Sequence, residues 1–163
     1  SHKTREILHM NVTYNPTEFW TMLQIKELMW ERDDVEYLIR DNDAIYGNTL
    51  KELIKTFDVQ DTPTSLRSPW QNGYCERLIG SIRRELLNHV IIVNENQARK
   101  LLNEYKSYYN NYRTHLGLNK RSPCIRSSGY QGEIESRRMC SGLHYTYSRK
   151  SISKIGSNFS IAA

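Results

Sequence analysis

Two carboxylates stand at positions where a folded chain could hold a metal ion. Asp41 directly follows the short, mostly apolar stretch 37–40, which predicts a strand, and Glu76 falls in the first turn of a predicted helix. A carboxylate at the end of a buried strand is costly unless it meets a cation. Mg²⁺ prefers oxygen ligands, and strand ends and helix starts hold such ligands rigidly. The pattern therefore indicates divalent-cation chemistry with Asp41 and Glu76 as metal ligands.

Each carboxylate has a simpler alternative. Asp43 competes with Asp41, because residues two apart in an extended chain point to the same face. Either aspartate could also be a plain turn residue. A glutamate in the first turn of a helix is, taken alone, a good partner for the helix dipole.

The segment around Glu76 contains further candidate residues. Residues 61–73 contain prolines, Asn72 and Gly73, which predict a mobile loop before a helix from about 74 to 89. Glu76, Gly80 and Arg83 share one face of that helix at i, i+4 and i+7. The apolar residues expected to face the core are Leu78, Ile79, Ile82 and Leu86. Glu85 is expected at the surface.

Periodicity places these residues in an alternating α/β chain. Strands are expected over 6–14, over 35–40 and near Val59, with a possible hairpin strand at 143–147. Helices are expected from Pro16 to about 31, over 48–57, and from about 96 to 112. This order predicts a partly parallel sheet with helices against it. The tyrosines of 105–112 recur at helical spacing and are expected in the core rather than stacked on bases.

The positive charge is concentrated at the C-terminal end. Residues 1–120 hold equal numbers of basic and acidic residues, so the net charge of +5 lies in residues 121–163. A core of 1–120 and a basic tail of 121–163 are therefore the two expected parts. Such a tail suits a polyanion, because Lys and Arg contacts to phosphate supply sequence-independent affinity. The alternative is a solvated surface tail.

The remaining composition favours a soluble, cytoplasmic protein. No apolar run approaches the roughly 18 residues that cross a bilayer, and no signal-peptide pattern is present. Three scattered cysteines fit reduced thiols. A zinc site of Cys124, Cys140 and His144 would lack a fourth ligand and has no standard spacing.

The motifs taken together resemble the integrase catalytic domain of DDE transposases from bacterial insertion sequences. The resemblance is carried by Asp41 with Tyr46 five residues later, by the stretch 68–77 leading into Arg83, and by a separation of 34 residues between Asp41 and Glu76. His9–Thr13, Asn15–Thr17 and Tyr109–Leu116 resemble other segments of that family.

This resemblance implies an RNase H-like fold, a mixed sheet flanked by helices, and DNA integration or transposition by metal-dependent phosphoryl transfer. Asp41 and Glu76 would bind Mg²⁺ or Mn²⁺. Gly80 would let a DNA backbone approach, and Arg83, with Arg77 and Arg84, would contact DNA. His115 would be a packing or DNA-proximal residue, since metals take the place of a general base. The resemblance also implies that this protein acts as a homo-oligomer.

The family also has a first catalytic aspartate, for which the sequence shows no counterpart. Glu6 and Glu18, the earliest acidic residues, do not match its position. We therefore expect an N-terminally truncated core without its first strands, with weak metal binding and little or no activity alone. The alternative function is a non-catalytic, DNA-binding remnant of a transposase, and a structural protein would bind no DNA.

Overall fold

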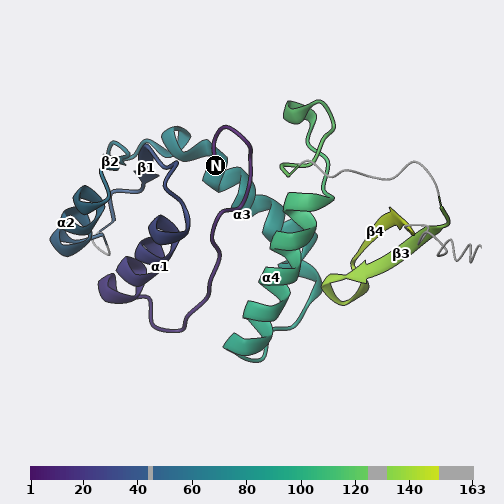
Figure 1. Ribbon diagram of the computed structural model, residues 1–163. Helices are drawn as coiled ribbons and strands as arrows, with labels where there is room; N and C mark the ends of the chain where they lie inside the picture. Colours follow the sequence, from purple (N-terminus) through teal and green to yellow (C-terminus); the bar gives the residue numbers. More distant parts are fainter. Residues whose placement is uncertain (44–45, 125–131, 151–163) are drawn as a thin grey trace, which may run out of the picture.

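The protein combines helices with two small sheets. A computed structural model describes residues 1–43, 46–124 and 132–150 (Figure 1). The helices are α1 (Glu18–Glu31), α2 (Asn48–Thr56), α3 (Gly73–Glu85) and α4 (Glu95–Asn111). The strands are β1 (Tyr37–Arg40), β2 (Gln60–Pro63), β3 (Ile134–Met139) and β4 (His144–Arg149). Short 3₁₀ turns lie at Pro69–Asn72, Leu87–His89, Leu116–Leu118 and Cys140–Gly142. The predicted α/β class is confirmed.

The first sheet pairs β1 and β2 in parallel, as the sequence predicted. Tyr37 lies opposite Gln60, and Arg40 lies opposite Pro63. The apolar sides of the neighbouring helices bury one small core, made of Met29, Leu50, Ile54 and Val59. The helical spacing within α2 is confirmed, since Leu50 and Ile54 are both fully buried.

A second core lies between α3, α4 and the hairpin of β3 and β4. Its buried members are Ile7, Leu86, Leu101, Tyr105, Tyr109, Met139 and Cys140. Tyr105 is completely buried, and Tyr108 and Tyr112 pack against the cluster. The expectation that these tyrosines belong to the core is therefore confirmed.

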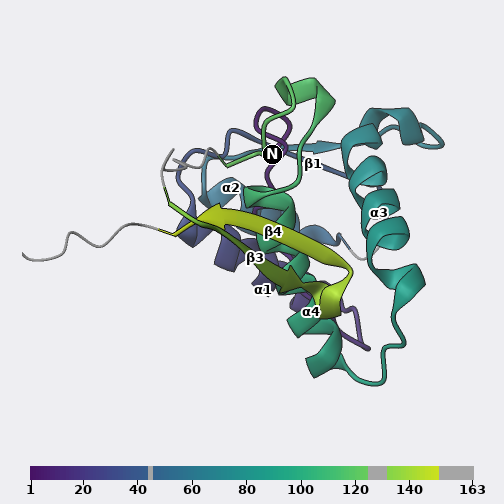
Figure 2. The same ribbon diagram turned by 90° about the vertical axis from the view of Figure 1, so that its right-hand side faces the viewer.

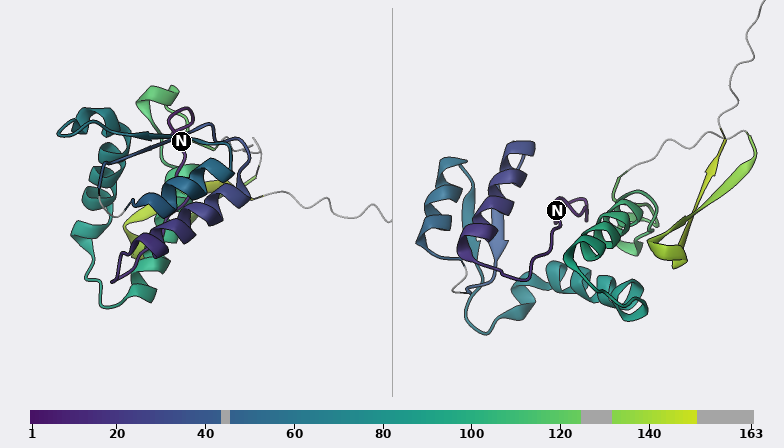
Figure 3. Two further views of the ribbon diagram at one scale, coloured as in Figure 1. Left: turned by 90° about the vertical axis from the view of Figure 1, so that its left-hand side faces the viewer. Right: turned by 90° about the horizontal axis from the view of Figure 1, so that it is seen from below.

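Helix α3 joins the two groups of elements. It starts beside β1 and β2 and runs behind α4 (Figure 1), and the view from below shows the same connection (Figure 3, right). Asn94 caps the neighbouring helix α4, because its side chain accepts a hydrogen bond from the Gln97 backbone N–H at 2.8 Å.

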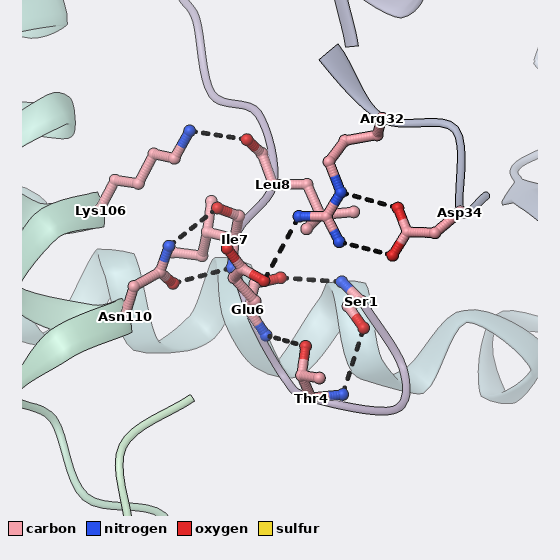
Figure 4. Close-up of polar contacts among 9 residues, drawn as sticks. All are labelled: Ser1, Thr4, Glu6, Ile7, Leu8, Arg32, Asp34, Lys106 and Asn110. Carbon is pink, nitrogen blue, oxygen red and sulfur yellow. Dashed lines mark hydrogen bonds and ion pairs between the residues drawn. The ribbon is translucent and has the colours of Figure 1, made fainter. Parts of the chain in front are cut away.

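The predicted strand over 6–14 is wrong. This segment pairs with no strand in the described part of the chain, and side chains take the place of a strand partner (Figure 4). Asn110 accepts from the Ile7 N–H at 2.9 Å and donates to the Ile7 carbonyl at 3.0 Å. Lys106 donates to the Leu8 carbonyl at 2.6 Å, and Arg32 lies 3.7 Å from Glu6. An apolar, β-branched pattern alone does not distinguish such a segment from a strand.

The predicted bounds around α3 also change. Residues 61–63 belong to β2 and 69–72 form a 3₁₀ turn, so only 64–68 of the expected loop lack a regular element. The helix ends at Glu85, because Leu86 leaves helical geometry with φ −133° and ψ −66° and is fully buried. Ile79, expected to face the core, is 46% exposed.

The C-terminal hairpin is longer than the sequence predicted. Strand β4 extends to Arg149, and its partner β3 was not predicted. The hairpin crosses the outside of α4 (Figure 2). Periodicity missed β3 because its sequence, Ile-Glu-Ser-Arg-Arg-Met, has no apolar alternation and is exposed except at Met139.

Glu85 is not the surface residue that was expected. Its carboxylate makes a two-oxygen contact with the Arg113 guanidinium, with Nη2–Oε1 at 2.6 Å and Nε–Oε2 at 2.9 Å. The Tyr105 hydroxyl donates to Glu85 Oε2 at 2.9 Å. His115 stands beside this pair, packed against the Tyr109 ring at 4.7 Å. The end of α3 is therefore tied to Tyr105 of α4 and to Arg113 just beyond α4, and His115 packs beside this pair.

We predict that Glu85 makes stability depend on acid pH. Desolvation acts to raise the pKa of Glu85, but the hydrogen bonds from Arg113 and Tyr105 outweigh it and lower the pKa below its ordinary 4.5. A lowered folded-state pKa gives stability that is present above 4.5 and is lost as the pH falls through the folded-state value. Glu85→Gln should therefore cost about 1.5–3 kcal/mol at pH 7 in urea unfolding, and this difference should shrink below pH 4.5.

Glu52→Gln is the matched control, because Glu52 forms an exposed ion pair with Lys55 at 2.9 Å. Its cost should stay below about 0.5 kcal/mol at all pH values. A Glu85→Gln cost that stayed constant from pH 7 to pH 3 would show that the charge pair contributes nothing.

Candidate active site

The end of β1 meets the start of α3, and this meeting places the two predicted carboxylates in one region. Asp41 follows the last residue of β1, and its Oδ1 accepts a hydrogen bond from Asn72 Nδ2 at 3.1 Å. Asn72 is the last residue of the 3₁₀ turn that leads into α3, and Glu76 lies in the first turn of the helix. Asp41 and Glu76 are both exposed.

The pKa of the Cys75 thiol is affected by both carboxylates. Desolvation, followed by the Asp41 and then the Glu76 carboxylate, raises the pKa of the Cys75 thiol. Burial and then Asp41 also raise the pKa of Tyr46. Both carboxylates therefore act on the same thiol, which is consistent with Asp41 and Glu76 lying in one region.

A buried ion pair fixes the backbone beside Asp41. Arg40 is 4% exposed, and its Nε and Nη2 lie 2.8 and 2.7 Å from the two carboxylate oxygens of Asp61 on β2. Its remaining nitrogen, Nη1, donates to the Asp41 carbonyl at 3.2 Å. The guanidinium also lies 5.1 Å from the centre of the Tyr46 ring. Arg40 thus joins β1, β2 and the Asp41 backbone.

Asp43, the alternative to Asp41, lies two residues further along the chain. Its carbonyl accepts a hydrogen bond from the Tyr46 N–H at 3.1 Å, and residues 44–45 between them are not described. The contact with Asn72 is made by Asp41. This contact favours Asp41 as the partner of the α3 start.

The candidate DNA-binding residues lie along α3. Arg77, Arg83 and Arg84 are exposed, and none of them pairs with a carboxylate in the described part of the chain. A side-chain carbon added at Gly80 would lie 3.0 Å from Arg84 Nη1. The space that Gly80 leaves is therefore occupied by the Arg84 guanidinium, which faces the same surface as Glu76 and Arg83.

The described residues, 1–43, 46–124 and 132–150, contain no cluster of three or more metal-binding side chains (His, Cys, Asp or Glu) that is placed to hold a metal ion. Mg²⁺ is commonly held by one or two carboxylates with water and substrate phosphates as the other ligands. Asp41 and Glu76 therefore fit a single, weakly held ion better than a pair.

Sequence reasoning missed three residues of this region. Asn72 was noted only as a turn residue, although its place in the stretch before Glu76 was visible. The Arg40–Asp61 pair had no sequence signal, because the register that brings residues 40 and 61 together depends on the pairing of β1 with β2. A hollow of about 590 Å³ lies away from both carboxylates, between α4 and β3.

Known proteins with similar sequences are transposases. The integrase core domain model matches residues 58–123. Transposase InsD for insertion element IS2A/D/F/H/I/K of Escherichia coli is 27% identical over 147 residues, covering 85% of this chain and 46% of that protein. The putative transposase InsD for insertion element IS2E of E. coli strain K12 has the same identity, with 64% of its length covered. The chain thus spans roughly half to two thirds of these relatives.

The fold is also found in a solved structure. The catalytic core domain of BIV integrase superposes with a TM-score of 0.53 at 21% identity, over 69% of this chain and 72% of that one. This likeness supports the predicted RNase H-like, integrase-core architecture. In the described residues, no helix is long and apolar enough to span a membrane.

We predict that the Arg40–Asp61 pair is essential to the sheet. Arg40→Met should cost about 3–5 kcal/mol in urea unfolding, because it leaves the Asp61 carboxylate without its cation in a largely buried place. The double variant Arg40→Met/Asp61→Leu should recover at least half of that loss.

Arg32→Met is the matched control. It removes solvent-accessible pairs with Asp34 at 2.8 Å and with Glu6 at 3.7 Å and should cost about 1 kcal/mol or less. Equal losses at Arg32 and Arg40, or a double variant no better than Arg40→Met, would contradict this role.

Proposed function

We propose that the chain, which is similar to transposases and to the integrase core domain, acts in DNA integration or transposition. The reaction would be metal-dependent phosphoryl transfer, in which a DNA strand is cut and its 3′-hydroxyl is joined to target DNA. The proposal takes DNA as the partner and a homo-oligomer as the acting form. The core would comprise residues 1–120, followed by a basic tail.

The observation that carries this proposal is the contact between Asp41 and Asn72 at 3.1 Å. It brings the end of β1 against the start of α3, one turn from Glu76. The carboxylates come from two different elements and lie on exposed surface rather than in a closed pocket. An open acidic region suits a polymeric substrate, which approaches a surface rather than entering a cavity.

Asp41 and Glu76 would be the ligands of Mg²⁺ or Mn²⁺. The bound ion would supply Lewis acidity at a phosphodiester oxygen and lower the pKa of a ligated water or hydroxyl. Arg40 would position Asp41 by donating a hydrogen bond to the backbone carbonyl of Asp41. Asn72 orients the Asp41 carboxylate, because its donated hydrogen bond leaves the second carboxylate oxygen for the ion.

The arginines of α3 would hold the DNA. The helix that presents Glu76 also carries positive charge on Arg77, Arg83 and Arg84. A DNA strand whose phosphates bound these arginines would run alongside the carboxylates. The guanidinium of Arg84 across Gly80 places one of these charges close to the helix surface.

A non-catalytic, DNA-binding role is the second candidate. It is favoured by the absence of a third metal-binding side chain in the described residues. The two candidates differ in what the carboxylates do, since only catalysis requires Asp41 and Glu76.

We predict that Mn²⁺ binding depends on both carboxylates. In calorimetric titrations Asp41→Asn and Glu76→Gln should each weaken Mn²⁺ binding at least tenfold, because each removes one of two charged ligands. Asp43→Asn is the matched control and should bind Mn²⁺ like the unchanged chain. Loss of binding in Asp43→Asn alone would move the site to the rival aspartate.

Nicking of labelled DNA in Mn²⁺ separates the two candidate functions. Metal-dependent nicking that disappears in Asp41→Asn and Glu76→Gln supports catalysis. DNA binding without nicking, unchanged in both variants, supports the non-catalytic role.

A further inference from the structure

The β3–β4 hairpin has two chemically different faces. The register pairs Arg138 with Tyr145, Ser136 with Tyr147 and Ile134 with Arg149. Since side chains alternate across a sheet, these six residues share one face, which we call the outer face. The other face carries Met139, Thr146 and His144, with Glu135 and Arg137 further along.

The inner face fastens the hairpin to the helices. Met139 is 8% and Thr146 is 4% exposed. The His144 ring stacks on Tyr108, with centres 4.1 Å apart, and its Nε2 lies 3.0 Å from the Glu85 carbonyl. The hairpin is therefore held on a fixed support across α4 (Figure 2). Of the outer face, Arg138 borders a hollow with Gln97 and Glu104 of α4.

The outer face combines positive charge with exposed aromatic rings. Tyr145 is 46% and Tyr147 is 64% exposed, and they lie two residues apart on β4 between Arg138 and Arg149. The outer face contains no acidic residue. The hairpin's Glu135 lies on the inner face, where it pairs with Lys150 at 3.3 Å. The two exposed tyrosines thus share the outer face with Arg138 and Arg149.

We propose that the outer face binds single-stranded DNA. Exposed aromatic rings on a rigid sheet stack unpaired bases, and neighbouring arginines hold the phosphates on either side. A duplex would offer phosphates to Arg138 and Arg149 but would hide its base faces from the tyrosines. The inference rests on the proposed DNA function, but it requires neither Asp41 nor Glu76. The outer face should therefore bind single-stranded DNA in preference to duplex DNA.

Fluorescence anisotropy of labelled oligo(dT) in EDTA tests this inference on the full chain. Tyr145→Ala and Tyr147→Ala should each weaken binding about tenfold, because each removes a stacking ring. Tyr145→Phe and Tyr147→Phe should retain binding, because they keep the ring. A duplex of the same length should bind more weakly and should not respond to these changes.

The arginines give a separate signature. Arg138→Gln and Arg149→Gln should each reduce the slope of log K against log salt by about 0.7, as expected when one phosphate contact is lost. The tyrosine variants should leave that slope unchanged. Arg137→Gln is the matched control, since Arg137 is adjacent in sequence and exposed but lies on the inner face; its binding should change by less than about twofold.

Several results would overturn the inference. Unchanged oligo(dT) binding in both alanine variants would exclude stacking, and an equal loss in Arg137→Gln would indicate diffuse charge instead of a defined face. Duplex binding as tight as oligo(dT) binding, equally reduced by the tyrosine changes, would also contradict it. If the unchanged chain bound Mn²⁺ but no oligo(dT), this face alone would be rejected. If it bound oligo(dT) but no Mn²⁺, only the carboxylate site would be rejected.

Discussion

The buried pair between Arg40 and Asp61 is the interaction on which the candidate site depends. Strands β1 and β2 have four residues each and pair only with one another in the described chain. A two-stranded parallel sheet of that length has few backbone hydrogen bonds and is weak alone. The pair adds two short charge-assisted bonds across the sheet and a third to the Asp41 carbonyl. Without it, the end of β1 has little to fix its direction.

Helix α3 connects the β1–β2 sheet to the rest of the molecule. Its start contacts Asp41 through Asn72, and its last residue, Glu85, is tied to Arg113 and Tyr105. A helix held at both ends presents its exposed face at a defined place. Glu76 and the arginines of α3 lie between these two held ends of the helix. The hairpin is fastened to the same end through His144, so two DNA-facing surfaces would share one support.

Sequence patterns predicted the parts that depend on local periodicity. The spacing of Leu50 and Ile54 identified α2, and the tyrosines identified the buried side of α4. Asp41 and Glu76 were singled out by their places after a strand and in a first helical turn, and the structure brings those places together. Their metal-binding role stays a prediction.

The failures have a common physical cause, which is that nonlocal pairing decides them. Residues 6–14 have strand-like composition, yet Asn110 and Lys106 take their backbone groups. Glu85 looked like a surface residue because its partner, Arg113, lies 28 positions away. β3 was missed because a strand with a solvated outer face has no apolar alternation to detect.

The most direct test of the central claim is where Mn²⁺ first acts on the folded chain. In an NMR titration, substoichiometric Mn²⁺ broadens backbone amide signals according to their distance from the ion. The account predicts that signals of residues 40–42 and 72–77 broaden first and together. Broadening that began elsewhere, for example around Asp33 and Asp34 or Glu133 and Glu135, would contradict a metal site formed by Asp41 and Glu76.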